Sequence, residues 1–196
     1  MVEYRNLESG QHIKRVKGFT KLLAEQIAQL YPEYGLTPKQ IDVIVAASAL
    51  HDVGKIAISD GILLKPGRLT KEEFVIMKTH TVEGSEIIEH MKGIGDGEYE
   101  KVSYDIARYH HERFDGRGYP DGLVGDEIPI AAQIVAVADV YDALVSKRCY
   151  KKSWTPEQAR EEILSQAGQQ FDPEITKLFD EHFDEFLKVM EDYPDA

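Results

Sequence analysis

The sequence predicts an all-α fold: a single domain over residues 1–196, built as a bundle of roughly seven or more helices. Most segments repeat apolar residues at spacings close to 3.6, and no segment shows the strict alternation of a half-buried β-strand. Capping-box signals open three of the segments, at Thr37, Thr70 and Thr155. Helices of this kind bury their apolar faces against one another, so a helical bundle is expected.

The composition is that of a globular protein with a core of its own. The chain has 196 residues, of which 42% are hydrophobic and 30% charged, and this length is enough to bury a substantial core. Its net charge of −12 argues against binding to duplex nucleic acid. Neither a membrane-spanning run nor a signal peptide is found. The single Cys149 fits a reducing cytoplasm, which is where we expect the protein.

The first predicted helix covers residues 6–31, where Val16, Leu23 and Ile27 lie on an apolar face. Near its start Glu8 and His12 are four residues apart, so they share one face of the helix. Such a pair can bind a metal ion, but it is also an ordinary surface pair. These residues alone leave both interpretations open.

A second helix is predicted to begin at Thr37 and to lie at the centre of the core, because residues 41–50 are apolar on nearly every side. The apolar run leads into adjacent His51 and Asp52. Burying these two side chains is costly unless a partner satisfies them. A metal ion suits both an imidazole nitrogen and a carboxylate oxygen. The alternative is a core histidine that is hydrogen-bonded to its neighbouring carboxylate.

The middle of the chain is predicted to contain three helices separated by turns, and two of them lead to histidines. The predicted segments are one from Thr70 toward His80, one over residues 82–91 and one over residues 99–111, which includes His110 and His111. Residues 114–122 are too rich in glycine and proline for any regular element.

A strongly apolar helix is predicted over residues 130–145, with Asp139 in its middle. A carboxylate in such a place is almost never fully buried unless it is paired or bound, and Asp142 is a second polar residue on the same side. The last two helices are predicted over residues 155–167 and from residue 173 to about 191.

Residues of the types that commonly bind metals therefore occur at the ends or on the inner faces of the predicted helices. The candidates are Glu8, His12, His51, Asp52, His80, His110, His111 and Asp139. Imidazoles and carboxylates without a thiolate suit iron or manganese, whereas a structural zinc site often uses cysteine. Eight candidate ligands indicate two or three divalent metal ions.

The chain resembles an HD-GYP domain, a subgroup of the HD phosphohydrolase superfamily. The matching stretches run in order over about residues 6–173, and the long one at residues 110–120 is far more diagnostic than a bare His-Asp pair. They are His51-Asp52-Val53-Gly54-Lys55, residues 65–70, His80, the His-His-Glu-Arg-Phe-Asp-Gly-Arg-Gly-Tyr-Pro stretch at residues 110–120, and residues 136–144. One departure is Gln133, where the family often has arginine.

The resemblance implies an all-α HD-domain bundle that hydrolyses cyclic di-GMP to linear pGpG or GMP in bacterial signalling. It implies that Asp52 bridges two metal ions and that the full set of metal ligands is His51, Asp52, His80, His110, His111 and Asp139. Glu8 and His12 match the positions that hold a third metal. Lys55 is the lysine of the His-Asp motif and is expected to stabilise charge on the phosphoryl oxygens.

Substrate contacts are implied at Tyr119, Arg148 and Lys151. In addition, Gly116 and Gly118 are expected to let the loop backbone approach a guanine closely, and Tyr119 to offer a stacking face. Each of the charged residues has an ordinary alternative as a solvated surface side chain, and Tyr119 has one as a packed loop residue.

Two other functions remain open at this point. One is a module that senses the dinucleotide without hydrolysing it, or that docks a GGDEF-type protein through the Gly-Tyr-Pro loop. The other is a phosphohydrolase that acts on a hybrid cyclic GMP-AMP, because no residue distinguishes guanine from adenine. All of these functions take a cyclic dinucleotide or a protein as partner, rather than duplex nucleic acid or a membrane.

Overall fold

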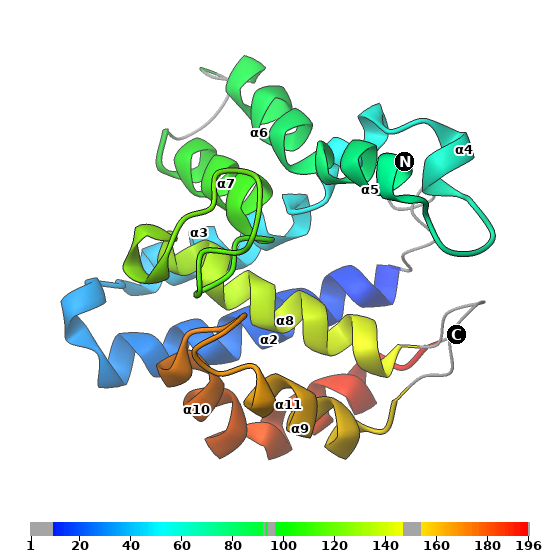
Figure 1. Cartoon of the computed structure of the whole chain (residues 1–196). Coiled ribbons are helices and arrows are strands. Elements are labelled where there is room, and N and C mark those ends of the chain that lie inside the picture. The colour runs from blue at the N-terminus through cyan, green and yellow to red at the C-terminus, as the bar shows by residue number, and fades with distance from the viewer. Residues whose placement is uncertain (1–9, 92, 94–96, 147–153, 196) are drawn as a thin grey trace.

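The computed structural model describes residues 10–91, 93, 97–146 and 154–195. Two long helices cross the middle of this part of the chain, α2 (Gly10–Leu30) and α8 (Ile130–Val145), and they pack against each other (Figure 1). Helix α8 begins and ends at the residues predicted from the apolar segment over residues 130–145. Of α2, the predicted residues 6–9 lie outside the described residues.

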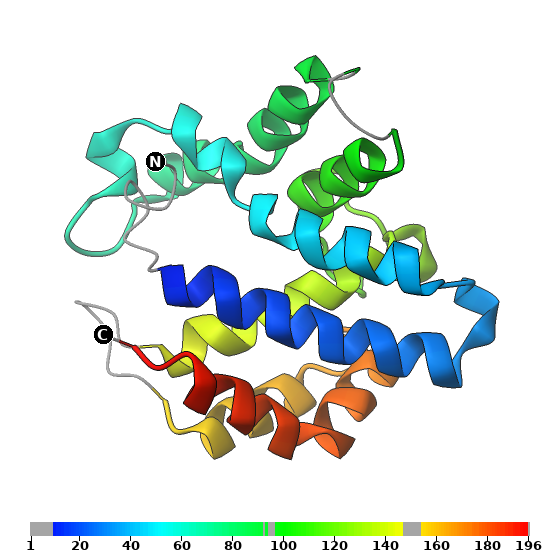
Figure 2. The ribbon, with the colours of Figure 1, turned by 180° about the vertical axis from the view of Figure 1, so that it is seen from behind.

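The other helices form layers on the two sides of this central pair (Figures 1 and 2). One side carries α3 (Pro38–Ala47), α6 (His80–His90) and α7 (Gly97–Tyr109), and the opposite side carries α9 (Pro156–Ser165), α10 (Pro173–Glu181) and α11 (Phe183–Asp192). Two shorter helices, α4 (Asp60–Leu63) and α5 (Lys71–Lys78), lie beyond the start of α6. The described residues contain two isolated β-bridges and no strand. The predicted all-α fold is therefore confirmed.

Local capping signals set several helix starts. The side chains of Thr37, Thr70 and Thr155 each accept a hydrogen bond from the backbone N–H three residues later. In each case a glutamine or glutamate side chain accepts one from the threonine N–H in return. Each box satisfies two N–H groups that the first helical turn leaves free. All three predicted capping boxes are confirmed.

The main core lies between the central pair and the C-terminal helices. Phe19 of α2 stacks on Phe186 of α11 at 4.6 Å between ring centroids, and Tyr141 of α8 packs edge-on against Phe19 and Phe179. All four side chains are 0% exposed. Burying each one contributes about 1.5–3 kcal/mol, so this cluster fixes α2 against α8.

Two predicted helices differ from the structure. Helix α3 is buried along one side only, through Ile41, Ile44 and Ala47, and the chain continues as a 3-10 turn before His51. The predicted last helix is split at His182, whose φ of −110° and ψ of 24° leave helical geometry. The bend lets α10 and α11 both direct phenylalanines at Tyr141. The single-domain boundary over residues 1–196 stays a prediction.

Candidate metal centre

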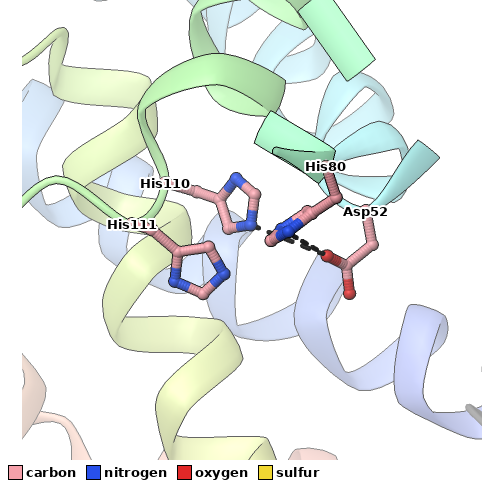
Figure 3. A group of neighbouring side chains, drawn as sticks. All are labelled: Asp52, His80, His110 and His111. Atoms are coloured by element: carbon pink, nitrogen blue, oxygen red, sulfur yellow. Dashed lines mark ion pairs between the residues drawn. The ribbon is translucent and has the colours of Figure 1, made fainter. Parts of the chain in front are cut away.

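Five segments bring seven candidate ligands into two neighbouring groups. The first ligand group consists of Asp52, His80, His110 and His111, and the second of His12, His51 and Asp139. Within each group the ligand atoms all lie within 4.8 Å of one another. Figure 3 shows the first group, with the rings of His80 and His110 turned toward the carboxylate of Asp52.

Asp52 lies between the two groups and faces both. Its Oδ1 is 3.3 Å from His80 Nε2 and 3.7 Å from His110 Nε2. Its Oδ2 is 3.4 Å from Nε2 of His51, which in turn lies 3.6 Å from Asp139 Oδ1. One carboxylate thus offers an oxygen to each group, the arrangement expected of a bridging ligand.

Backbone carbonyls fix the orientation of three of the histidine rings. These contacts are His51 Nδ1 to Ser48 O at 2.8 Å, His80 Nδ1 to Met77 O at 2.7 Å and His110 Nδ1 to Ile106 O at 2.9 Å. A carbonyl oxygen only accepts, so each Nδ1 carries the hydrogen and donates it. In the neutral form of each ring, Nε2 then has its lone pair toward the centre, as a metal ligand needs.

The environment of these Nε2 atoms fits a divalent cation. The Nε2 atoms of His51, His80 and His110 are buried and make no hydrogen bond to any described residue. A buried acceptor without a partner costs about 1–3 kcal/mol, and a metal ion would remove that cost at all three. Burial lowers the pKa of His110 and of His111, which favours the neutral form that binds metals. Burial also acts to lower the pKa of His51, but the carboxylates of Asp52 and Asp139 outweigh it and raise that pKa well above its ordinary value.

Lys55 lies beside the bridging carboxylate. Its Nζ is 2.5 Å from Asp52 Oδ2, and its side chain is 18% exposed. Burial opposes ionisation of Asp52, but the charge of Lys55 and the neighbouring histidines outweigh it and hold the pKa of this carboxyl well below its ordinary value. Asp52 therefore stays ionised, and the side chain of Lys55 borders the ligand groups beside it.

The glycine of the His-Asp motif, Gly54, lies where the structure has no room for a side chain. A Cβ at this position would lie 1.8 Å from the carbonyl oxygen of His80. The 3-10 helix η3 (Val53–Ala57) therefore packs directly on the start of α6. This close approach holds Asp52 next to His80.

The loop after His111 is organised by Glu112, which is only 3% exposed. Its carboxylate accepts hydrogen bonds from the backbone N–H groups of Asp121, Gly122 and Leu123, at 2.7, 3.0 and 3.1 Å. Burial raises the pKa of Glu112, although these three donors oppose the shift. This role was not predictable from the sequence, in which Glu112 simply follows the two histidines.

One of the three predicted substrate-binding residues in this loop, Tyr119, lies against the first ligand group. The ring of Tyr119 stacks on His111, with 4.9 Å between centroids. Both glycines are required by the packing of the loop itself: Gly116 has a φ of +78°, and a Cβ on Gly118 would lie 2.3 Å from the Arg113 nitrogen. Their contact with a guanine stays a prediction.

Other predicted residues have different outcomes. Glu8, Arg148 and Lys151 lie outside the described residues. Asp142, expected as a second polar residue on the same side as Asp139, lies with it beside His12: Asp142 Oδ2 accepts a hydrogen bond from His12 Nδ1 at 2.7 Å, and Asp139 Oδ1 is 3.8 Å from His12 Nε2. Arg15, which sequence reasoning missed, forms an ion pair with Asp142.

A family model of the HD domain matches residues 7–175. The chain belongs to the HD domain family. This HD domain has the long Gly-Tyr-Pro stretch at residues 110–120, and its predicted resemblance to HD-GYP domains is confirmed. The match covers every candidate ligand and most of the bundle.

The chain is similar to parts of longer proteins that have named activities. It is 46% identical over 194 residues to a 3′3′-cGAMP-specific phosphodiesterase 2 of Vibrio cholerae, covering 99% of this chain and 35% of the relative. It is 39% identical over 199 residues to a cyclic di-GMP phosphodiesterase of the same species, covering 100% of this chain and 40% of the relative. The chain thus spans less than half the length of these relatives.

The fold also matches a solved structure. An HDG"Y"P protein from Bdellovibrio bacteriovorus superimposes with a TM-score of 0.62 at 21% identity, over 86% of this chain and 50% of that one. This likeness supports the helical arrangement. Among the described residues, no helix of the HD domain is both long and apolar enough to cross a membrane.

Proposed function

We propose that this HD domain hydrolyses a 3′–5′ phosphodiester bond of cyclic di-GMP, giving linear pGpG or GMP, with two or three divalent iron or manganese ions. The observation that carries the proposal is the pair of ligand groups joined by Asp52. The names of the relatives, which are cyclic-dinucleotide phosphodiesterases, support the same reaction class. A cytoplasmic location, expected from the single Cys149, belongs to this proposal.

The two ligand groups are the residues that would hold the metals. The first group would hold one ion and the second group another, with Asp52 shared between them. Glu8 is proposed to join His12 in holding a third. Bound divalent ions offset the negative charge of a phosphodiester and lower the pKa of a water molecule toward neutrality. The donor set of nitrogen and oxygen atoms suits such ions.

Lys55 is proposed as the catalytic cation. Its ammonium group is held at the edge of the ligand groups by its ion pair with Asp52. A positive charge fixed at this place stabilises negative charge that develops on phosphoryl oxygens in the transition state. Because the charge is already in position, no reorganisation is needed when the reaction occurs.

Tyr119, Gly116 and Gly118 are proposed to bind a base of the substrate. The stack of Tyr119 on His111 places an aromatic ring directly beside the first ligand group, and aromatic rings bind bases by stacking. Arg148 and Lys151 are proposed to hold the second phosphate, because they follow the end of α8 in the sequence.

A hybrid cyclic GMP-AMP is the second candidate substrate. The observation that favours it is the 46% identity to a relative named as specific for 3′3′-cGAMP. A domain that senses the dinucleotide without hydrolysing it is disfavoured, because seven ligand-type residues are brought together. Docking of a GGDEF-type protein on the Gly-Tyr-Pro loop is compatible with hydrolysis and belongs to the same proposal.

A substrate panel resolved by chromatography tests the proposal. Protein purified without oxygen and loaded with iron or manganese is expected to hydrolyse cyclic di-GMP or the hybrid dinucleotide. The variant Asp52→Ala is expected to be inactive while it keeps the helical signal of the wild type. Undiminished turnover by chelator-treated, metal-free protein would overturn the metal-dependent mechanism.

A further inference from the structure

A buried ion pair joins α2 to α8 directly behind the second ligand group. Arg15 is 1% exposed and Asp142 is 0% exposed. The guanidinium of Arg15 donates from Nε to Asp142 Oδ1 at 2.5 Å and from Nη2 to Oδ2 at 3.2 Å. Charges buried this deeply persist only when their geometry and hydrogen bonds are good. The fork of the guanidinium meets both carboxylate oxygens, as this requires.

The same carboxylate orients a candidate metal ligand. Nδ1 of His12 lies 2.7 Å from Asp142 Oδ2. An ionised carboxylate only accepts, so Nδ1 of the neutral ring carries the hydrogen. The other ring nitrogen, Nε2, then offers its lone pair toward the second ligand group, where it lies 3.8 Å from Asp139 Oδ1.

His12 differs in this respect from the other oriented histidines. The rings of His51, His80 and His110 are held by backbone carbonyls, which are part of the helical scaffold and cannot turn. The orientation of His12 instead depends on a side chain that Arg15 holds in place. The orientation of one ligand of the second group therefore depends on a side chain rather than on the backbone.

Arg15 is in turn fixed by contacts just past the ends of α8 and α11. Its Nη2 donates to Ser146 Oγ at 2.8 Å, just past α8, and its Nη1 donates to the Tyr193 carbonyl at 2.8 Å, just past α11. A surface arginine has no such set of partners. The guanidinium thus takes one orientation, and its two carboxylate contacts select one orientation of Asp142.

We propose that Arg15 and Asp142 are positioning residues that set the tautomer of His12 and so decide whether the second ligand group holds its metal. The inference rests on the proposed metal-dependent function. It adds that metal loading of the second group depends on two residues that do not themselves face the ions. A purely structural ion pair between α2 and α8 would leave the His12 tautomer and the metal content unchanged when it is altered conservatively.

The variant Asp142→Asn separates these two roles. Arg15 only donates, so it takes the amide oxygen of the new side chain and turns the amide NH₂ toward His12. Nδ1 must then accept, and the hydrogen moves to Nε2, the atom that should face the metal. Changes to groups that orient metal ligands typically cost about 10–100-fold in metal affinity, and a weakening of this size is expected for one class of Mn²⁺ sites.

Two measurements on the full chain test the proposal. The first is nitrogen NMR of histidine-labelled, chelator-treated protein, which reports the tautomer of His12 without any metal. The second is Mn²⁺ titration with stoichiometry. Asp180→Asn serves as a control, because it alters another Arg–Asp pair between two helices, the partly exposed pair of Arg160 Nε and Asp180 Oδ1 at 2.6 Å, which bridges α9 and α10.

The expected result is hydrogen on Nδ1 of His12 in the wild type and in Asp180→Asn, hydrogen on Nε2 in Asp142→Asn, and weaker binding of one Mn²⁺ in Asp142→Asn alone. Hydrogen on Nε2 in the wild type would overturn the inference without any variant, even if Asp142→Asn did not fold. Unchanged tautomer and stoichiometry in Asp142→Asn would overturn it as well, while leaving the proposed function intact. A wild type that binds no Mn²⁺ at all would overturn the proposed function and this inference together.

Discussion

At the scale of single residues, three of the buried histidines are oriented by the same kind of hydrogen bond to the backbone. His51, His80 and His110 each donate Nδ1–H to a carbonyl three or four residues earlier, close to where a helical segment ends or begins. In the neutral form of each ring, this contact places the hydrogen on Nδ1 and leaves the lone pair on Nε2, and it lowers the entropy cost of fixing the side chain on metal binding. Because the partners are backbone atoms, substitution of neighbouring side chains should leave these three ligands in place.

Lys55 provides a prediction at this scale. Lys55→Gln removes the charge beside Asp52 but keeps much of the side-chain volume. We expect kcat to fall by about 10²–10³-fold, the usual effect of losing one group that stabilises transition-state charge, with the metal content unchanged. Steady-state kinetics together with metal analysis measure both. Lys101→Gln is the control, since Lys101 forms a similar short pair with Asp105 at 2.6 Å on the surface. Equal activity of the two variants would remove Lys55 from the mechanism.

Asp115 provides a prediction about pH. Burial would raise the pKa of this carboxyl, but hydrogen bonds from Arg113 and Arg117 outweigh it and lower the pKa to about 2. A lowered folded-state pKa gives stability that is complete above the unfolded pKa of about 3.9 and is lost as pH falls toward 2. Arg117 is 71% exposed, so solvent screening keeps the effect below about 1 kcal/mol.

Denaturant unfolding of the wild type and of Asp115→Asn measures this effect. The wild type should be slightly more stable at neutral pH, and the difference should shrink between about pH 4 and pH 2. A difference that stays constant over this range would show that the charge of Asp115 is not its source.

At the scale of elements, the direct packing of η3 on α6 places Asp52 beside His80. Gly54→Ala should destabilise the protein by about 1–3 kcal/mol, as expected for overpacking a tight contact, because its Cβ would lie 1.8 Å from a backbone oxygen. Gly61→Ala in α4 is the matched control: its Cβ would meet nothing within 4 Å. That change should be neutral or stabilising by about 0.4–1 kcal/mol. Equal unfolding free energies for the two variants would contradict the packing argument.

The helices show what local sequence can and cannot determine. The starts of α3, α5 and α9 were predictable because each capping threonine lies within three residues of its partner. The break at His182 was not, because no proline or glycine marks it. It depends on how Phe179 and Phe183 pack around a tyrosine from a distant helix.

The same distinction holds for the candidate site. Ligand-type residues were predictable from their chemistry and their places at helix ends. The pairing of Arg15 with Asp142 was not, since an arginine on an amphipathic helix is expected at the surface. Its partner is 127 residues away in the sequence, so only the fold brings the two together.

At the scale of the whole molecule, the ligand groups draw on both the central pair and the layer above it. Helices α2 and α8 supply His12 and Asp139, while the segments around α3, α6 and α7 supply the others. A metal bound across them would therefore hold these parts of the bundle together. Metal binding to the folded state alone stabilises it through mass action.

We accordingly expect chelation to lower the unfolding free energy of the HD domain. At free metal of about 100 times the dissociation constant, the difference is about 2.7 kcal/mol per site. Denaturant titrations with and without Mn²⁺ measure it, and Asp52→Ala is the control in which Mn²⁺ should have little effect. Equal stabilisation of both proteins would place the bound ions elsewhere.

The central claim is that the two ligand groups form one metal centre that acts on a cyclic dinucleotide. Metal analysis of protein kept free of oxygen, joined to an assay on cyclic di-GMP in the same sample, tests it most directly. We expect two or three iron or manganese ions per chain and hydrolysis that is lost with the metal. A protein that contains no metal, and in which neither iron nor manganese restores activity, would contradict it.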